Sequence, residues 1–251
     1  MAKRLPWFQG RPLLSAPMRW PAGVLLAACV IVVATLGLLT AHQTRADWLD
    51  ARIDAAIITR LASHTQVVDF VVGLGNTRTS TVICVVLVLS CLALRRPRGA
   101  VLFTVAVPVA IVTTEYLLKP LFGRKLGFGL SFPSGHESVV STMAFGAILV
   151  LTGPARPALP AALRWLLAAV AAAAIIALAP ALVAIHYHYF TDTIGGAAIG
   201  LGTVLATALS LDAVMARLAR TRAGCAGSAP AGDEMTAGDG MTAAARRLPP
   251  A

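Results

Sequence analysis

Long apolar runs separated by short polar connections dominate the sequence. Six runs are each expected to cross a membrane as a helix, because a hydrocarbon core of about 30 Å needs about 20 helical residues and no run alternates as a strand does. The second run is shorter, but arginines at both of its ends can reach the interfaces and extend it. The predicted spans are Pro21–Ala41, Thr79–Leu94, Gly99–Leu118, Ser138–Gly153, Trp165–Ile185 and Thr193–Leu211.

Polar stretches divide the chain into three parts. A basic arm, residues 1–20, precedes the six-helix membrane domain of residues 21–216, and the tail of residues 217–251 is rich in Ala, Gly, Thr and Pro, which predicts disorder. The connection at residues 42–78 is expected to hold a short interfacial helix, because apolar side chains recur there at near-helical spacing among charges. Those side chains are Trp48, Leu49, Ile53, Ile57 and Ile58.

The composition agrees with a membrane protein. Hydrophobic residues make up 57% of the 251 positions and charged residues 13%, whereas charged residues are about a quarter of an ordinary soluble domain. The net charge of +10 does not indicate a nucleic-acid partner, because the basic residues lie in short clusters between apolar runs. The four cysteines have no spacing typical of a zinc or haem site.

The basic residues also predict the orientation of the helices, because cytoplasmic connections accumulate Lys and Arg. With six spans, fourteen of the 21 basic residues fall on the side of the two termini. On the opposite side, the four arginines between residues 42 and 78 are balanced by four aspartates. We therefore expect a multi-pass cell-membrane protein with both termini in the cytoplasm and with its first, third and fifth connections outside.

Ionisable groups are scarce, and three groups of polar residues gather at outer ends of the spans. The first group, Lys119, Arg124 and Lys125, follows the third span. A phosphate ester is an anion that cations hold well, so these three side chains are candidate phosphate ligands. Glu115 lies four residues before Lys119, and a helical ion pair would orient that lysine.

The second group, Ser134, Gly135 and His136, opens the fourth span. At a helix N-terminus, free N–H groups and the helix dipole favour a bound anion. The glycine permits close approach of the ligand, and the histidine titrates near neutral pH and can give a proton to a leaving oxygen. This segment is therefore a candidate phosphate cradle with a general acid attached.

The third group, His188 and Asp192, lies at the start of the sixth span. On a helix, a spacing of four places both side chains on one face, so the carboxylate can hold one ring nitrogen and leave the other free to attack phosphorus. His186 would point elsewhere, and we interpret it and the neighbouring tyrosines as interfacial aromatic residues.

These three groups, in this order and each at an outer helix end, resemble the three signature motifs of the type-2 phosphatidic-acid phosphatase family. That family shares its core with vanadium haloperoxidases. The resemblance covers residues 115–196, and its most specific part is the sequence FPSGH at residues 132–136. It implies an all-α, helical-bundle phosphatase core of haloperoxidase type. We expect no cofactor and no metal ion, because no carboxylate or histidine cluster in the sequence offers the ligand count that magnesium or zinc requires.

The resemblance also implies roles for single residues. Ser134 and Gly135 correspond to the family's phosphate-binding residues and His136 to its general acid. His188 corresponds to the nucleophile, with Asp192 four residues further on.

The sequence departs from the family pattern at two places. The family pattern has a lysine, then six residues, then Arg-Pro. In this sequence Lys119 is followed by four residues and then by Arg124, and position 126 is Leu126. The arginine expected six residues before the nucleophile is replaced by Leu182. Losing one bidentate arginine removes about 1.5–3 kcal/mol of charge-assisted binding, so either Lys125 or another cation replaces it or activity is weak.

The expected function is therefore that of a membrane phosphatase acting on a lipid phosphate or diphosphate through a phosphohistidine. Polyprenyl diphosphate, phosphatidic acid and phosphatidylglycerol phosphate are all compatible substrates, and the sequence indicates no oligomeric state. Two alternatives stay open. One is a weak or silent lipid-phosphate-binding protein, and the other is a phosphotransferase that uses the same intermediate.

Overall fold

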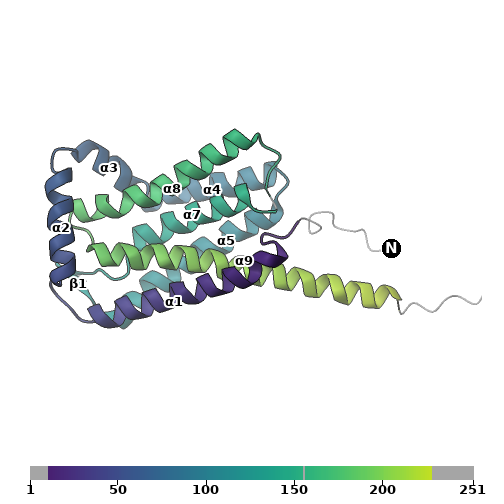
Figure 1. Ribbon diagram of the computed structural model, residues 1–251, viewed down its shortest axis with the longest axis horizontal. Coiled ribbons are helices and arrows are strands. Elements are labelled where there is room, and N and C mark those ends of the chain that lie inside the picture. Colours follow the sequence, from purple (N-terminus) through teal and green to yellow (C-terminus); the bar gives the residue numbers. More distant parts are fainter. Residues whose placement is uncertain (1–10, 155, 228–251) are drawn as a thin grey trace, which may run out of the picture. The chain divides into compact units, whose positions relative to one another are not determined.

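The computed structural model describes residues 11–154 and 156–227, and these residues are almost entirely helical (Figure 1). Strand in the described residues is limited to one short antiparallel hairpin. The predicted all-α fold class is thus confirmed. The elements in chain order are η2 (Ala16–Met18), α1 (Arg19–Thr40), α2 (Trp48–Leu61), α3 (Thr65–Gly73), α4 (Thr77–Ala93), α5 (Pro97–Ile111), η3 (Val112–Leu118), α6 (Lys119–Phe122), β1 (Lys125–Leu126), β2 (Gly129–Leu130), α7 (Gly135–Thr152), α8 (Ala161–Ala184) and α9 (Phe190–Gly227).

The long helices are apolar enough to cross a membrane. Five helical stretches are long and apolar enough to be membrane spans. The pair of α3 and α4, which is bent by 55°, makes a sixth when it is counted as one span. Large apolar side chains remain exposed on them, among them Ile31 at 64% and Leu38 at 73% of α1. Such faces suit contact with lipid rather than water. The five stretches are Ala16–Thr40, Pro97–Phe122, Gly135–Thr152, Ala161–Ala184 and Phe190–Thr221.

The connection at residues 42–78 holds two helices where the sequence predicted one. Asp47 begins α2 by accepting hydrogen bonds from the backbone N–H groups of Leu49 and Asp50 at 2.9 and 2.8 Å. The second helix, α3, leads into α4 through the bend. Sequence patterning did not identify α3 as a separate helix, because its apolar residues form the outer part of the second, bent span.

Because successive spans run in opposite directions, their ends gather in two groups within the bundle of residues 11–216. One group contains the last turns of α1 and α8, the first turns of α4, α7 and α9, and α2, which lies across these ends (Figure 1). We name it the α2 end. The other group, the Asp212 end, contains the connections that follow α4 and α7 and the residue Asp212 of α9.

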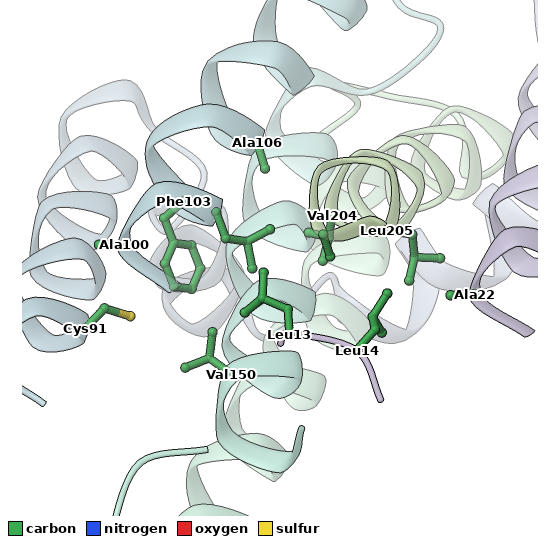
Figure 2. Packing of buried hydrophobic residues seen from close by; sticks show 12 residues of the cluster. Leu13, Leu14, Ala22, Cys91, Ala100, Phe103, Ala106, Val150, Val204 and Leu205 are labelled. Atoms are coloured by element: carbon green, nitrogen blue, oxygen red, sulfur yellow. The ribbon is translucent and has the colours of Figure 1, made fainter. Parts of the chain in front are cut away.

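At the Asp212 end, one buried carboxylate holds the chain's first described segment. Asp212 accepts hydrogen bonds from the backbone N–H groups of Leu13 and Leu14 at 3.1 and 2.9 Å, and it pairs with Arg98 at 3.1 Å. Figure 2 shows Leu13 and Leu14 packed with side chains of α5, α7 and α9 in a hydrophobic cluster.

Glycines let α9 approach α7 closely. A Cβ on Gly196 would lie 2.7 Å from the carbonyl oxygen of Ser134, and one on Gly200 would lie 2.6 Å from Cβ of Ser141. Atoms do not approach this closely without a shift of the backbone. The small residues therefore fix the first turns of α7 and α9 side by side.

The end of α9 differs from the prediction. Residues 217–227 are helical, whereas the sequence predicted disorder from residue 217. Alanine and arginine are strong helix formers, which explains why the helix continues past the membrane domain. The remainder of the predicted tail, and the basic arm before residue 11, lie outside the described residues.

Candidate active site

The segment after α5 brings Lys119 to the α2 end. The helix passes through the π-helical turn η3 into α6, and π turns are frequent at functional sites. As the sequence predicted, Glu115 pairs with Lys119, whose Nζ lies 2.8 and 2.9 Å from the two carboxylate oxygens. Gly123 then ends α6 in the left-handed conformation at φ 60°.

The first turn of α7 is bonded to the first turn of α9. Ser134 begins α7 as its N-cap and accepts a hydrogen bond from the backbone N–H of Glu137 at 3.3 Å. Its own N–H donates to the carbonyl oxygen of Asp192 at 3.0 Å. The hydroxyl predicted to bind phosphate is thus fully buried and already engaged at the helix start.

Gly135 lies directly against the Glu115–Lys119 pair. A Cβ at this position would lie 2.0 Å from Oε1 of Glu115 and 3.7 Å from Nζ of Lys119. A lysine and a carboxylate therefore already sit on the helix N-terminus where the sequence predicted a phosphate. Any side chain larger than that of glycine would force this pair away.

The two histidines of the predicted site face one cavity. His136 lies in the first turn of α7, with its ring 6.2 Å from the ring of Tyr187, and His188 is 7% exposed. Both line the cavity described below. His186, two residues before His188, is exposed and lies outside this lining, in agreement with its interpretation as an interfacial residue.

His188 and Asp192 meet in a different way from that predicted. His188 precedes α9, so the two residues do not share a helix. Asp192 reaches back from the first turn, and its Oδ2 accepts the backbone N–H of Tyr189 at 3.0 Å, as in a capping box. Nδ1 of His188 lies 3.7 Å from the same oxygen and has no hydrogen-bond partner. The carboxylate is thus adjacent to the ring but not hydrogen-bonded to it.

Arg124 is not placed where a phosphate in the cavity could reach it. Its side chain is fully buried, with one nitrogen 2.5 Å from Asp50 and another 2.6 Å from Asp192 and 2.8 Å from the hydroxyl of Thr191. The ring of Tyr189 covers it, 4.2 Å from the guanidinium carbon. The predicted phosphate ligand is therefore engaged in an internal charge network, and Tyr189 is a buried residue, not the interfacial aromatic residue that the sequence indicated.

Two aspartates of α2 complete this network, and the sequence did not identify them. Asp50 accepts the backbone N–H and the hydroxyl of Thr191 at 2.9 and 2.8 Å, and Asp54 accepts the backbone N–H of Phe190 at 3.1 Å. These N–H groups belong to the first turn of α9, where a negative charge is favourable. The available signal was their spacing of four on α2, which places both on one helix face.

The crowding of acids changes the proton affinity of Asp54. The pKa of its carboxyl is raised from 3.8 to about 6, mainly by burial and, to a smaller extent, by the negative charge of Asp50. The hydrogen bond from Phe190 opposes this rise without cancelling it.

One cavity of about 830 Å³ connects these groups to the membrane-spanning helices. Its polar part lies at the α2 end, and its apolar part continues between α4 and α5. In the described lining, Lys119 is the single lysine or arginine, since neither Arg124 nor Lys125 contributes and position 126 is a leucine. The polar lining includes Glu115, Lys119, Gly135, His136 and His188, and the apolar lining includes Val85, Val88, Leu89, Phe103, Val107 and Ile111.

Leu182, which stands where the family has an arginine, is fully buried in a hydrophobic cluster with Val140, Met143 and Leu178. This position therefore supplies no cation to the site. Among the described residues, no group of three His, Cys, Asp or Glu side chains could hold a metal ion.

Comparison with known proteins shows the fold and the family of the chain. No curated protein sequence matches the chain. A crystal structure described as that of the first transmembrane PAP2 type phosphatidylglycerolphosphate phosphatase, from Bacillus subtilis, is similar in fold, with a TM-score of 0.54 and 15% identity over 80% of this chain and 96% of that one. The family model of the PAP2 superfamily matches residues 70–215, which include every predicted site residue and more than half of the chain. The chain therefore belongs to the PAP2 superfamily.

Proposed function

We propose that this protein is a membrane phosphatase that hydrolyses a lipid phosphate or diphosphate through a phosphohistidine at His188. The observation that carries the proposal is the cavity, whose polar part holds Lys119, His136 and His188 and whose apolar part follows two membrane-spanning helices. A lipid phosphate has the same layout, with a charged head joined to an apolar chain. A soluble phosphate ester would leave the apolar part unused.

In the first step, the ring nitrogen Nε2 of His188 attacks phosphorus while Asp192, beside Nδ1, stabilises the positive charge that develops on the ring. The bond between phosphorus and the lipid oxygen breaks, and His136 gives its proton to that oxygen. In the second step, water attacks the phosphohistidine while His136 takes a proton from the water. This step releases inorganic phosphate and regenerates free His188.

Lys119 and the first turn of α7 are the groups that can neutralise the phosphate oxygens. We assign Arg124 a positioning role instead, because it holds Asp192 and is itself held by Asp50. Its contacts suit a residue that fixes the carboxylate beside the nucleophile.

We also propose that the α2 end faces the outside of the cell and that both termini are cytoplasmic. The one-sided distribution of basic residues supports this orientation. Phe128, at the tip of the β1–β2 hairpin, is fully exposed and offers a labelling position. A Phe128→Cys protein should react in intact cells with a thiol reagent that cannot cross the membrane, and protection there would refute the orientation.

The experiment that tests the activity uses the full chain purified in detergent. Phosphatidic acid, phosphatidylglycerol phosphate and a polyprenyl diphosphate are offered with a chelator present, and released phosphate is measured. We expect turnover without a divalent metal, because Lys119 and the first turn of α7 take its role, and inhibition by vanadate, which adopts the five-coordinate geometry of the attacked phosphorus. Turnover that stops in chelator and returns with magnesium would contradict the mechanism.

A silent lipid-phosphate binder is the second candidate, and one observation favours it. Leucines stand at positions 126 and 182, and Glu115 already neutralises Lys119. Binding of the lipid panel without any phosphate release would establish this alternative.

A further inference from the structure

The Asp212 end carries more positive charge than its described acids neutralise. Four arginines, Arg11, Arg95, Arg96 and Arg98, line one small pocket of about 20 Å³. Within the described residues, their acidic contact is the single pair of Arg98 with Asp212 at 3.1 Å. The pocket is thus a cluster of cations at the membrane face opposite the two histidines.

Arg96 lies where this pocket meets a larger cavity. Its Nε is buried and has no hydrogen-bond partner among the described residues. The same side chain, together with Val150, also lines an apolar cavity of about 510 Å³. A guanidinium N–H that has lost water and gained no acceptor favours an anionic partner, whose oxygens would satisfy it.

The α4 wall of the apolar cavity is about as long as one leaflet. Its wall on α4 is a stripe at near-helical spacing, Ile83, Leu87, Cys91 and Leu94, and α7 and α8 supply the remaining walls. From Ile83 to Leu94 a helix rises by about 16 Å. Half of a hydrocarbon core of about 30 Å is about 15 Å, so the cavity can take one acyl chain from headgroup level to the bilayer centre.

This cavity is separate from the candidate active site. The two cavities lie on different faces of α4 and share a single described residue, Phe103, whose ring forms part of the wall between them. The cation at the mouth of each is also different, Lys119 in one and Arg96 in the other. A lipid bound at Arg96 is therefore not a substrate in position for His188.

We propose that the cavity between α4, α7 and α8 binds one anionic phospholipid, with an acyl chain along the α4 stripe and its phosphate at Arg96. Arg11 and Arg95 supply further positive charge around the headgroup. Basic pockets between membrane-spanning helices are a known means of binding acidic lipid headgroups. Charge complementarity selects this occupant over a zwitterionic lipid, and the length of the stripe selects it over free phosphate.

A photoreactive lipid tests the proposal on the full chain in detergent. Phosphatidylglycerol with a diazirine in the middle of one acyl chain is bound and irradiated, and the modified peptides are identified by mass spectrometry. We expect label on residues 83–94, 143–151 and 167–174. Unlabelled phosphatidylglycerol should compete at least about fivefold better than phosphatidylcholine with the same chains, and inorganic phosphate should not compete.

Substitution of Arg96 gives the second arm of the test. Arg96→Gln should weaken binding of the probe by about fivefold, the factor that corresponds to about 1 kcal/mol for one arginine near the membrane surface. Arg156→Gln is the matched control, because Arg156 follows α7 at the same end, is exposed and lines neither cavity. Ala171→Trp, which fills the cavity from α8, should abolish labelling of these peptides.

Elution as a single species and an unchanged thermal unfolding curve confirm that each variant is folded. Equal labelling by the phosphatidylglycerol and phosphatidylcholine probes, or normal binding by Arg96→Gln, would overturn the proposal. Label confined to the cavity of His188 would also overturn it. None of these outcomes bears on whether the protein is a phosphatase.

Discussion

Each end of the membrane domain contains a buried pair of arginine and aspartate, and the two pairs are arranged differently. At the α2 end, Arg124 lies between Asp50 and Asp192, and all three side chains are 0% exposed. At the Asp212 end, Arg98 and Asp212 are 14% and 2% exposed. Here one carboxylate also holds two backbone N–H groups, and three further arginines surround the pair.

The difference shows what a buried ion pair is suited to. An arginine held between two carboxylates can fix the position of a reactive group, as Arg124 does for Asp192 beside His188. A pair within a surplus of cations fixes the chain's first described segment and leaves positive charge for an external anion. Removing one partner of a buried pair is costly in either case, because it leaves an unmatched charge.

The largest expected effect is at the α2 end. His188→Ala should reduce phosphate release by at least about 10³-fold and abolish any covalent phosphoenzyme, because the attacking nitrogen is lost. His136→Ala should still permit phosphorylation of His188 by substrates whose leaving group needs no proton. Rapid quenching with labelled substrate, under alkaline conditions that preserve phosphohistidine, measures both.

His186→Ala is the control for that experiment, since His186 is exposed and outside the cavity lining. It should retain normal turnover. Label on the His188→Ala protein would show that the nucleophile is assigned to the wrong residue.

The second effect concerns the network around Arg124. Arg124→Ala should lower kcat by about 10²–10³-fold, the scale of losing one preorganised group, with a small change in KM because Arg124 does not reach the cavity. Lys125→Ala, at an exposed neighbouring position, should have a mild effect. Steady-state phosphate release in detergent provides both parameters.

The Asp50→Asn variant distinguishes a positioning role of Arg124 from a phosphate-binding role. If Arg124 positions Asp192, loss of Asp50 should lower kcat as Arg124→Ala does. A ligand role predicts the opposite, since an arginine released from Asp50 would bind phosphate better. A lower KM with unchanged kcat in Asp50→Asn would therefore refute the positioning role.

The third effect lies at the Asp212 end and concerns stability rather than turnover. Asp212→Ala leaves Arg98 and two backbone N–H groups unmatched, so we expect a loss of about 3–5 kcal/mol in the free energy of unfolding. Phosphate release at low temperature should persist. Thermal unfolding in detergent measures the loss, with Asp69→Ala, at an exposed position, as control. An unchanged melting temperature in Asp212→Ala would contradict the role of this pair.

The smallest expected effect is a dependence of stability on pH. The pKa of Asp54 is raised to about 6 in the folded protein from 3.8, so the folded state binds its proton more tightly than the unfolded state. Its contribution to stability is fully present below about pH 3.8 and is lost as the pH rises through about 6. Asp54→Asn should remove this slope from thermal unfolding measured between these values, and an identical slope in both proteins would exclude Asp54 as its source.

The sequence predicted the membrane-spanning helices well, because length and hydropathy in lipid are local properties. It also placed Lys119, His136 and His188 together through their motifs, and the three line one cavity. The partners of Arg124 escaped prediction for a physical reason. The network joins residues that are far apart along the chain, Asp50, Arg124 and Asp192. The periodicity of the sequence does not indicate which buried charges come into contact.

Leu126 is a further instructive case. The motif pattern marked this position and Leu182 as departures, and sequence alone left open which cation would replace the arginine missing at Leu182. The structure places neither Arg124 nor Lys125 at the cavity, and Lys119 is the one cation of its described lining. A short hairpin turned these neighbouring residues in different directions, which spacing along the chain does not reveal.

The contact of Glu115 with Gly135 has a consequence for selectivity. A carboxylate tethered beside Lys119 is present at an effective concentration that no free ligand reaches easily, so an incoming anion must displace it. A singly charged head would exchange one carboxylate-like contact for another and gain little. In the proposed function, a doubly charged phosphate would gain more from the same lysine and helix N-terminus, so the tethered acid would favour lipid heads of higher charge.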